Sequence, residues 1–150
     1  MKKNRISNDL MLIIMTVVFT CGVGALSMGF LPAVKLCYES TEVVLEGLKC
    51  LFMISPLCSI ILIVGYGLSL AAFVVSYFGA KQKHHKTLFF VAAAMAIIGG
   101  VLILLEPILI KSGLNDLMII SVKYSVGPIL GFLFSLATSM ITFITGLVRN

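Results

Sequence analysis

Four long apolar runs alternate with short polar segments along this chain. The runs cover residues 10–31, 56–79, 87–110 and 124–148, and Glu106 is the one charged residue inside them. A helix needs about 20 apolar residues to cross the hydrocarbon core of a bilayer, and each run reaches that length. The pattern predicts an all-α polytopic membrane protein, a four-transmembrane-helix bundle that forms a single integral membrane domain over residues 1–150.

Two boundaries of these runs admit more than one interpretation. The uncharged stretch from Cys50 to Ala80 is longer than one straight span requires. Ser55-Pro56 places a capping hydroxyl before a proline, which predicts that the second helix begins at Pro56. The first run has a signal peptide as its alternative, but an apolar region of about 7–15 residues before a small-residue cleavage site is typical there. This run is longer and no clean site follows it, so we expect a retained span.

The composition excludes the main soluble classes. Hydrophobic residues make up 60% of the chain, charged residues only 11%, and the mean hydropathy is +1.16. A water-soluble domain of this size would lack the polar surface to cover its core. The net charge is +5, but the basic residues stand at the ends of the apolar runs and do not form a patch with interleaved aromatics. Nucleic acid is therefore not an expected partner, whereas the lipid bilayer is.

The lysines and arginines favour one orientation. If the N-terminus is inside, seven of them face the cytoplasm and four face outside. The inner group is Lys2, Lys3, Arg5, Lys81, Lys83, Lys86 and Arg149, and the outer group is Lys35, Lys49, Lys111 and Lys123. Short loops rich in lysine and arginine stay in the cytoplasm. We therefore predict a multi-pass protein of the plasma membrane with both termini cytoplasmic.

Small residues recur at four-residue spacing in the runs, and such rows let helices approach closely in lipid. The rows are Ala25/Gly29, Gly67/Ala71, Ala92/Ala96/Gly100 and Gly127/Gly131/Ser135/Ser139. They predict packing faces, although glycine and alanine are also simply common in membrane helices. Prolines bracket each outer loop (Pro32 and Pro56, then Pro107 and Pro128), which is compatible with a parallel two-fold internal repeat of the two halves.

The polar segment from Lys35 to Lys49 reads as a surface helix capped by Ser40. Glu42, Glu46 and Lys49 would share one face of that helix, with Glu39 close by. Clustered carboxylates can hold a hard cation. No asparagine or aspartate supplies a ligand loop here, so a solvated acidic face is the favoured interpretation.

Cys37 and Cys50 flank this segment, with twelve residues between them. The topology puts both on the oxidising side, where a disulfide would stabilise the loop by about 2–4 kcal/mol. A redox-active pair, a soft-metal site with Met28, Met53 or Met118, and two unpaired thiols remain as alternatives. No Cys-x-x-Cys motif supports thiol exchange. Cys21 and Cys58 lie within spans and read as small apolar fillers.

Glu106 is the candidate intramembrane polar site. Acids inside a span are functional candidates, but a position just before Pro107 also fits an interfacial residue that reaches the headgroups. His84-His85 has metal binding and pH sensing as alternatives to a solvated turn, which is favoured. The chain has no phosphate-binding glycine loop, no His-Glu-x-x-His and no nucleophile elbow, so neither an enzyme nor a cofactor is expected.

The loop between the first two spans carries a recognisable pattern. A cysteine follows the first span, and Lys49-Cys50 precedes the second. This resembles a family of small four-span bacterial membrane proteins of unknown function, whose members carry a Cys…Met-Lys-Cys loop at this place. Pro107-Ile108-Leu109-Ile110, then Met118 and Pro128, are similar to the second loop of that family.

The chain departs from the family pattern at several positions. Leu48 replaces the usual methionine, and Ser112 and Ile120 lie near the places of a second cysteine pair. The resemblance implies no known activity. Relatives look like companions of ABC-type export permeases, which implies an accessory subunit that binds a permease or associates with itself. The alternative is a small transporter or a thiol or soft-metal protein that uses Cys37, Cys50 and Glu106.

Overall fold

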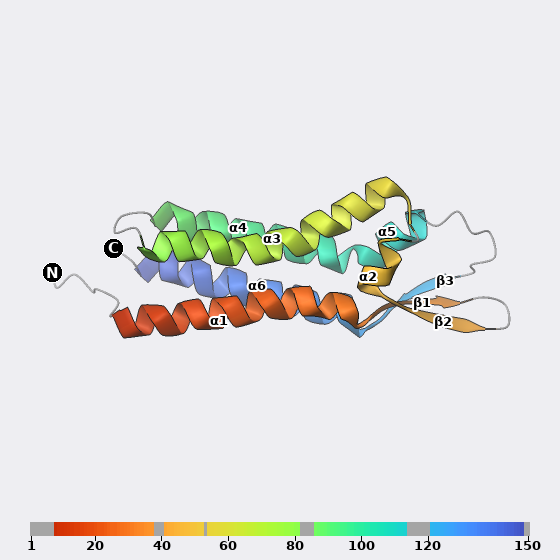
Figure 1. Ribbon diagram of the computed structural model, residues 1–150, viewed down its shortest axis with the longest axis horizontal. Coiled ribbons are helices and arrows are strands. Elements are labelled where there is room, and N and C mark those ends of the chain that lie inside the picture. The colour runs from red at the N-terminus through yellow and green to blue at the C-terminus, as the bar shows by residue number, and fades with distance from the viewer. Residues whose placement is uncertain (1–7, 38–40, 53, 82–85, 114–120, 149–150) are drawn as a thin grey trace.

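The computed structural model describes residues 8–37, 41–52, 54–81, 86–113 and 121–148. Four long helices dominate it (Figure 1): α1 (Asn8–Ser27), α3 (Pro56–Lys81), α4 (Lys86–Leu104) and α6 (Val126–Val148). They contain 20, 26, 19 and 23 residues. At 1.5 Å per residue these helices measure about 28–39 Å, enough to cross a hydrocarbon core of about 30 Å. The predicted all-α bundle of four membrane-spanning helices is confirmed.

The helices form a ring in which α1 packs against α3 and α6, and α4 packs against the same two. Successive helices run in opposite directions, so α1 begins and α6 ends where α3 gives way to α4 (Figure 1). We call this the turn end. The opposite end carries a small sheet, and we call it the sheet end. The cytoplasmic location of both termini stays a prediction.

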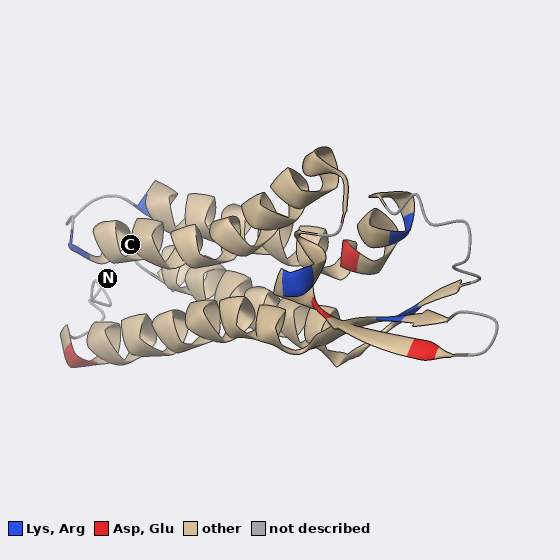
Figure 2. Ribbon diagram, turned by 45° about the vertical axis from the view of Figure 1, so that its right-hand side comes forward, with Lys and Arg blue, Asp and Glu red and all other residues tan. Residues whose placement is uncertain are grey.

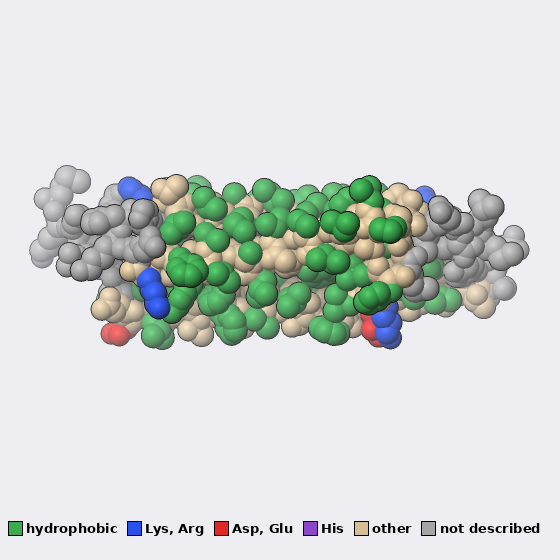
Figure 3. Space-filling view, turned by 45° about the horizontal axis from the view of Figure 1, so that its top comes forward, with side chains coloured by type: hydrophobic (Ala, Val, Ile, Leu, Met, Phe, Trp, Pro, Cys, Tyr) green, Lys and Arg blue, Asp and Glu red, His purple; other side chains and the backbone are tan. Residues whose placement is uncertain are grey.

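The surface has the distribution that a membrane requires. Lysine, arginine and acidic residues of the described chain lie toward the two ends of the molecule (Figure 2). Between the ends, the visible face is covered by hydrophobic side chains (Figure 3). Exposed residues such as Ile13, Ile63, Ile98 and Phe143 belong to this belt. Such a belt would be unfavourable in water and matches the hydrocarbon of a bilayer, which identifies a multi-pass membrane protein.

Two prolines set helix boundaries at the sheet end. α3 begins at Pro56, in the first turn, where the missing N–H is not needed. α4 ends at Leu104, and Pro107 cannot donate a hydrogen bond back to the carbonyl of Ile103. The chain resumes as a separate helix, α5 (Glu106–Gly113). The predicted run 87–110 is therefore two helices, and Glu106 lies outside the membrane-spanning one.

The polar segment after α1 is a sheet. The short 3-10 helix η1 (Met28–Phe30) leads into β1 (Pro32–Cys37), which pairs antiparallel with β2 (Glu42–Glu46) and with β3 (Ser121–Tyr124). The strand order is β2-β1-β3. The surface helix predicted for this segment is wrong, because residues 42–46 form a strand and, among the described residues of the segment, only those of α2 (Gly47–Cys50) are helical. Val43 and Val44 are β-branched and favour a strand, and Val34 and Leu36 alternate with exposed Lys35 along β1.

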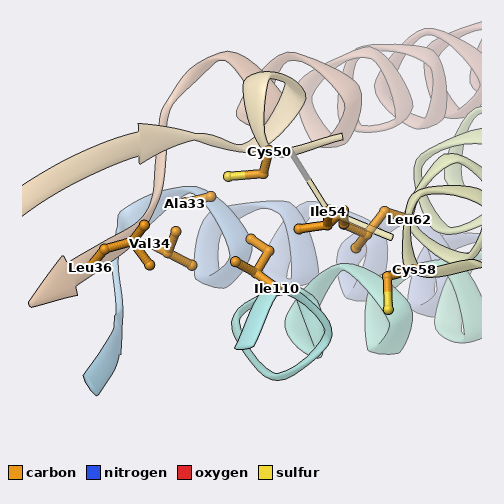
Figure 4. Close-up of a cluster of buried hydrophobic side chains, with 8 residues drawn as sticks. All are labelled: Ala33, Val34, Leu36, Cys50, Ile54, Cys58, Leu62 and Ile110. Carbon is orange, nitrogen blue, oxygen red and sulfur yellow. The ribbon is translucent and has the colours of Figure 1, made fainter. Parts of the chain in front are cut away.

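A hydrophobic core lies against the sheet, at the sheet end of the helix bundle, and we call it the second core to distinguish it from the interior of the bundle. It joins side chains from β1, α2, the start of α3 and α5 (Figure 4). Its buried members are Ala33, Val34, Leu36, Cys50, Ile54, Cys58, Leu62 and Ile110. The N–H of Ser55 also donates to the carbonyl of Gly113 over 3.3 Å, which ties the end of α5 to the start of α3. This core fixes α5, and thereby Glu106, at the sheet end of the bundle.

Three of the four predicted small-residue rows are buried. Ala92, Ala96 and Gly100 face the interior, as do the rows Ala25/Gly29 and Gly127/Gly131/Ser135/Ser139. The row on α3 is wrong, because Gly67 is exposed and a Cβ built on it would meet no atom within 4 Å. The packing face of α3 instead contains Gly65, Ser69, Ala72 and Ser76. The internal repeat stays a prediction, and the sheet-end segments of the two halves differ in structure.

Candidate functional site at the sheet end

Glu106 lies in the first turn of α5 and is fully buried, at 0% exposure. Its Oε2 accepts a hydrogen bond from the hydroxyl of Tyr66 on α3, over 3.0 Å. A residue that reached lipid headgroups would be exposed, so the interfacial interpretation is wrong. The carboxyl is held inside the protein, between the bundle and the second core.

The short helix α2 lies directly against this carboxyl. A Cβ built on Gly47 would stand 2.8 Å from Glu106 Oε1, 3.0 Å from the Tyr66 hydroxyl and 3.1 Å from the Gly29 carbonyl oxygen. Three oxygen atoms from α5, α3 and η1 thus lie around the position that a Cβ of residue 47 would occupy. No side chain fits there without moving them. Glycine at this position is what lets α2 cover Glu106.

The second carboxyl oxygen of Glu106 lacks a hydrogen-bond donor among the described residues. This oxygen, Oε1, is buried. Ion pairs join Lys49 to Glu46 and Lys123 to Glu42, both in the sheet region, and neither pair involves Glu106. Burial raises the pKa of the Glu106 carboxyl to about 7, while the hydrogen bond from Tyr66 acts in the opposite direction. Near neutral pH this group can therefore both bind and release a proton.

Cys50 is a second ionisable group at the sheet end, and the charge of Glu106 acts on it. It is fully buried on α2. Burial, and after it the negative charge of Glu106, raises the pKa of the thiol to about 12. A thiol needs to ionise to act as a nucleophile or a soft-metal ligand. Cys50 therefore behaves as a small apolar side chain in this position.

The predicted disulfide between Cys37 and Cys50 is not formed, and both residues are free thiols. Cys37 ends β1 and pairs with Glu42, toward which its thiol points over 3.7 Å. Cys50 lies beyond the opposite end of the same strand pair. Five residue steps of β1 extend roughly 17 Å, whereas a disulfide requires Cα atoms within about 7 Å. The extended strand pair, in place of the expected helix, separates them.

The remaining metal-site candidates fall partly within the described residues. Within the described residues no group of three His, Cys, Asp or Glu side chains could hold a metal ion. Glu42 and Glu46 are partly exposed and belong to the ion pairs above, which agrees with a solvated acidic face. Glu39, Met53, His84, His85 and Met118 lie outside the described residues.

Two residues of the Glu106 site were not identified from the sequence. Tyr66 sits in the middle of an apolar run, where tyrosine is unremarkable, and Gly47 sits in the segment assigned to a helix. The one signal that could have found Tyr66 is general: a buried acid needs a hydrogen-bond donor, such as a tyrosine, serine or threonine on a neighbouring helix. No protein-family model matches the chain, and no curated protein matches it either.

Proposed function

We propose that this chain is a non-catalytic subunit of the plasma membrane that binds an export-type permease of the ABC class through its sheet end. One observation carries the proposal, namely the edge of the sheet formed by β2. β2 is an edge strand that pairs only with β1 among the described residues. Its Glu42, Val43 and Val44 are exposed.

An open edge strand is a ready template for another chain. Its free backbone groups accept a further strand, and its exposed side chains give the contact specificity. Soluble proteins blunt such edges with charge or proline. Here the charges are confined to the two ends of β2, at Glu42 and Glu46, and Val43 and Val44 lie between them. The edge thus combines an apolar centre with a charged border, the usual composition of an interface.

The surroundings of the edge favour a membrane-embedded partner. Phe30, Phe52 and Leu57 are strongly exposed near the base of the sheet, and Phe52 is 90% exposed. Aromatic and aliphatic side chains at this level contact lipid or another membrane protein. With the orientation inferred from the lysines and arginines, the partner would be contacted on the outer side of the plasma membrane.

Site-specific photo-crosslinking in native membranes tests this proposal. A photoreactive amino acid at Val43 or Val44 should give an adduct that mass spectrometry identifies as an ABC-type permease. The same amino acid at Ile13, an exposed position on α1 near the turn end, is the matched control and should react with lipid. Adducts of β2 with lipid alone, or with a second copy of this chain alone, would contradict the proposal.

A small transporter is the second candidate, favoured by the buried Glu106. Intramembrane and membrane-adjacent acids with a pKa near neutrality are typical of proton-linked carriers. The purified protein in liposomes would then move a substrate driven by a pH gradient, and Glu106→Gln would abolish that movement. Transport that is unchanged in Glu106→Gln would exclude this role for the carboxyl.

A further inference from the structure

The geometry points to Glu106 as a proton-binding site that controls a cover formed by α2. With the proton bound, α2 stays closed over the carboxyl. When the proton leaves, α2 moves away and exposes Cys50. This inference concerns the sheet end itself and does not depend on the proposed permease.

The first step is the arrangement of hydrogen-bond groups around Gly47. Glu106 Oε1 and the Gly29 carbonyl oxygen both lie within 3.1 Å of the position of a Gly47 Cβ. Both are acceptors when Glu106 is ionised, and no donor of the described residues serves Oε1. A proton on Oε1 turns this oxygen into a hydrogen-bond donor, which the ionised carboxyl lacks. The closed arrangement therefore suits the neutral carboxyl and is unfavourable for the ionised one.

The second step is to identify the element that yields. The strand β1 and helices α3 and α5 share the second core, and α2 contributes Cys50 alone to it. α2 has only four residues. The N–H of Gly47 donates to the carbonyl of Leu31 over a long 3.3 Å, and the exposed Phe52 follows the helix. α2 is the least firmly held element around the carboxyl, so ionisation of Glu106 should move it first.

The third step is to ask which other groups could titrate here. From α3, Tyr66 faces Glu106 and donates to Oε2. From α2, Cys50 faces it, and burial keeps the pKa of this thiol at about 12. From η1, Gly29 contributes only a carbonyl. Lys49 on α2 pairs with Glu46 and lies on the exposed side. Glu106 is the group of this set that changes charge near neutral pH.

The test measures how fast Cys50 reacts with a maleimide. The protein carries Cys21→Ala and Cys58→Ala and is reconstituted in phosphatidylcholine vesicles. Mass spectrometry then quantifies the labelling of Cys50 relative to Cys37, a half-buried thiol on β1. Taking the ratio cancels the increase in labelling rate with pH that both thiols share. Negative charge on Glu106 alone would slow Cys50 labelling, so a rising ratio reports exposure.

Between about pH 6 and about pH 8 the ionised fraction of a group with a pKa near 7 rises about tenfold. We expect the labelling ratio to rise by a similar factor in the protein with Glu106. In Glu106→Gln, which mimics the neutral carboxyl, the ratio should stay low at both pH values. A flat ratio in the protein with Glu106, or an equal rise in the Glu106→Gln variant, would overturn the inference.

Two further variants keep the test decisive if Glu106→Gln does not fold. Tyr66→Phe removes the hydrogen bond that lowers the pKa of Glu106, so the midpoint of labelling should move to higher pH. Gly47→Ala places a methyl group against three oxygens, so Cys50 should label rapidly at both pH values. An unmoved pH midpoint of Cys50 labelling in Tyr66→Phe would contradict control by Glu106.

A salt control separates a proton from a metal cation. If sodium chloride, but not choline chloride, protects Cys50 from labelling at about pH 8, the site binds a cation instead of a proton, and the inference is overturned.

Discussion

The hydroxyl oxygens of Ser69 and Ser135 lie 2.8 Å apart, inside the bundle between α3 and α6. Two glycines of α4, Gly99 and Gly100, leave the space in which this contact forms. A Cβ on Gly99 would stand 2.7 Å from Ser69 Oγ, and a Cβ on Gly100 would stand 2.8 Å from the Cβ of Ser135. Three helices therefore meet at one point, where small residues permit close approach and a hydrogen bond joins the helices.

This hydrogen bond should contribute measurably to bundle stability. Ser69→Ala and Ser135→Ala should each lower the free energy of unfolding, and the double variant should show a coupling energy of about 0.6 kcal/mol, with an upper limit near 1.7. Reversible unfolding in mixed detergent micelles measures all three variants. Ser76→Ala is the control, because Ser76 donates to the carbonyl of Phe73 within its own helix. Additive effects of Ser69→Ala and Ser135→Ala would contradict the coupling.

The packing face of α6 should be sensitive to size. A Cβ on Gly131 would stand 2.9 Å from Ile103 Cγ2 of α4, so Gly131→Leu forces the helices apart and should destabilise the protein by about 1–3 kcal/mol or more. Leu133→Phe is the matched control, since Leu133 is 50% exposed on the same helix. Folded yield after detergent extraction compares the two. Equal yields would mean that this face of α6 is not a close interface.

The spans were predictable because their determinants are local. An apolar run of sufficient length has to be a helix in lipid, and Pro56 marks a helix start wherever it stands. The sheet was missed because its pairing is not local. Ser121–Tyr124 follows β1 by more than eighty positions and reads as a loop by itself. The face of α3 was assigned to Gly67 because sequence spacing does not reveal which side of a uniformly apolar helix meets its neighbours.

The Glu106 site was predictable only in part. An acid beside an apolar run indicated a candidate, but the sequence left burial and interfacial exposure equally open. The burial depends on α2, which a helical reading of residues 35–49 placed on the surface. Tyr66 and Glu106 are forty positions apart, and no pattern joins them. The predicted disulfide is wrong because the helical prediction for residues 35–49 did not reveal the extended strand pair that separates Cys37 from Cys50.

The topology can be tested with alkaline phosphatase, which is active only outside the cytoplasm. A fusion after Glu42 in β2 should be active, and a fusion after Lys86 at the start of α4 should be inactive. The basis is the excess of lysine and arginine at the turn end. Enzyme activity of both fusions is normalised to their protein levels. The reverse pattern would place the sheet in the cytoplasm and the permease contact on the inner side.

The cysteines should prove to be free. Thiols are blocked before lysis, and the non-reduced protein is digested and analysed by mass spectrometry. Cys37 and Cys50 should both be recovered without a linkage between them, because strand geometry separates them. At about pH 6, where the neutral Glu106 keeps α2 closed, complete alkylation of Cys50 should require denaturation, since it is buried in the second core. A Cys37–Cys50 peptide would show that the strand pair rearranges in the membrane.

Glu106 should also make stability depend on pH. Its pKa is about 7 in the folded protein against an ordinary value of 4.5. Between these values the folded state holds a proton that the unfolded state has lost, so the free energy of unfolding falls as pH rises. This loss of stability is absent below about pH 4.5, is complete above about pH 7, and amounts to roughly 3 kcal/mol at most.

The variant Glu106→Gln isolates this carboxyl. It lacks the ionisation but shares every other titrating group, so the difference between the two profiles of unfolding free energy against pH reports Glu106 alone. We expect Glu106→Gln to gain stability relative to the parent protein as pH rises through this window. Parallel profiles would mean that folding does not raise the pKa of this carboxyl.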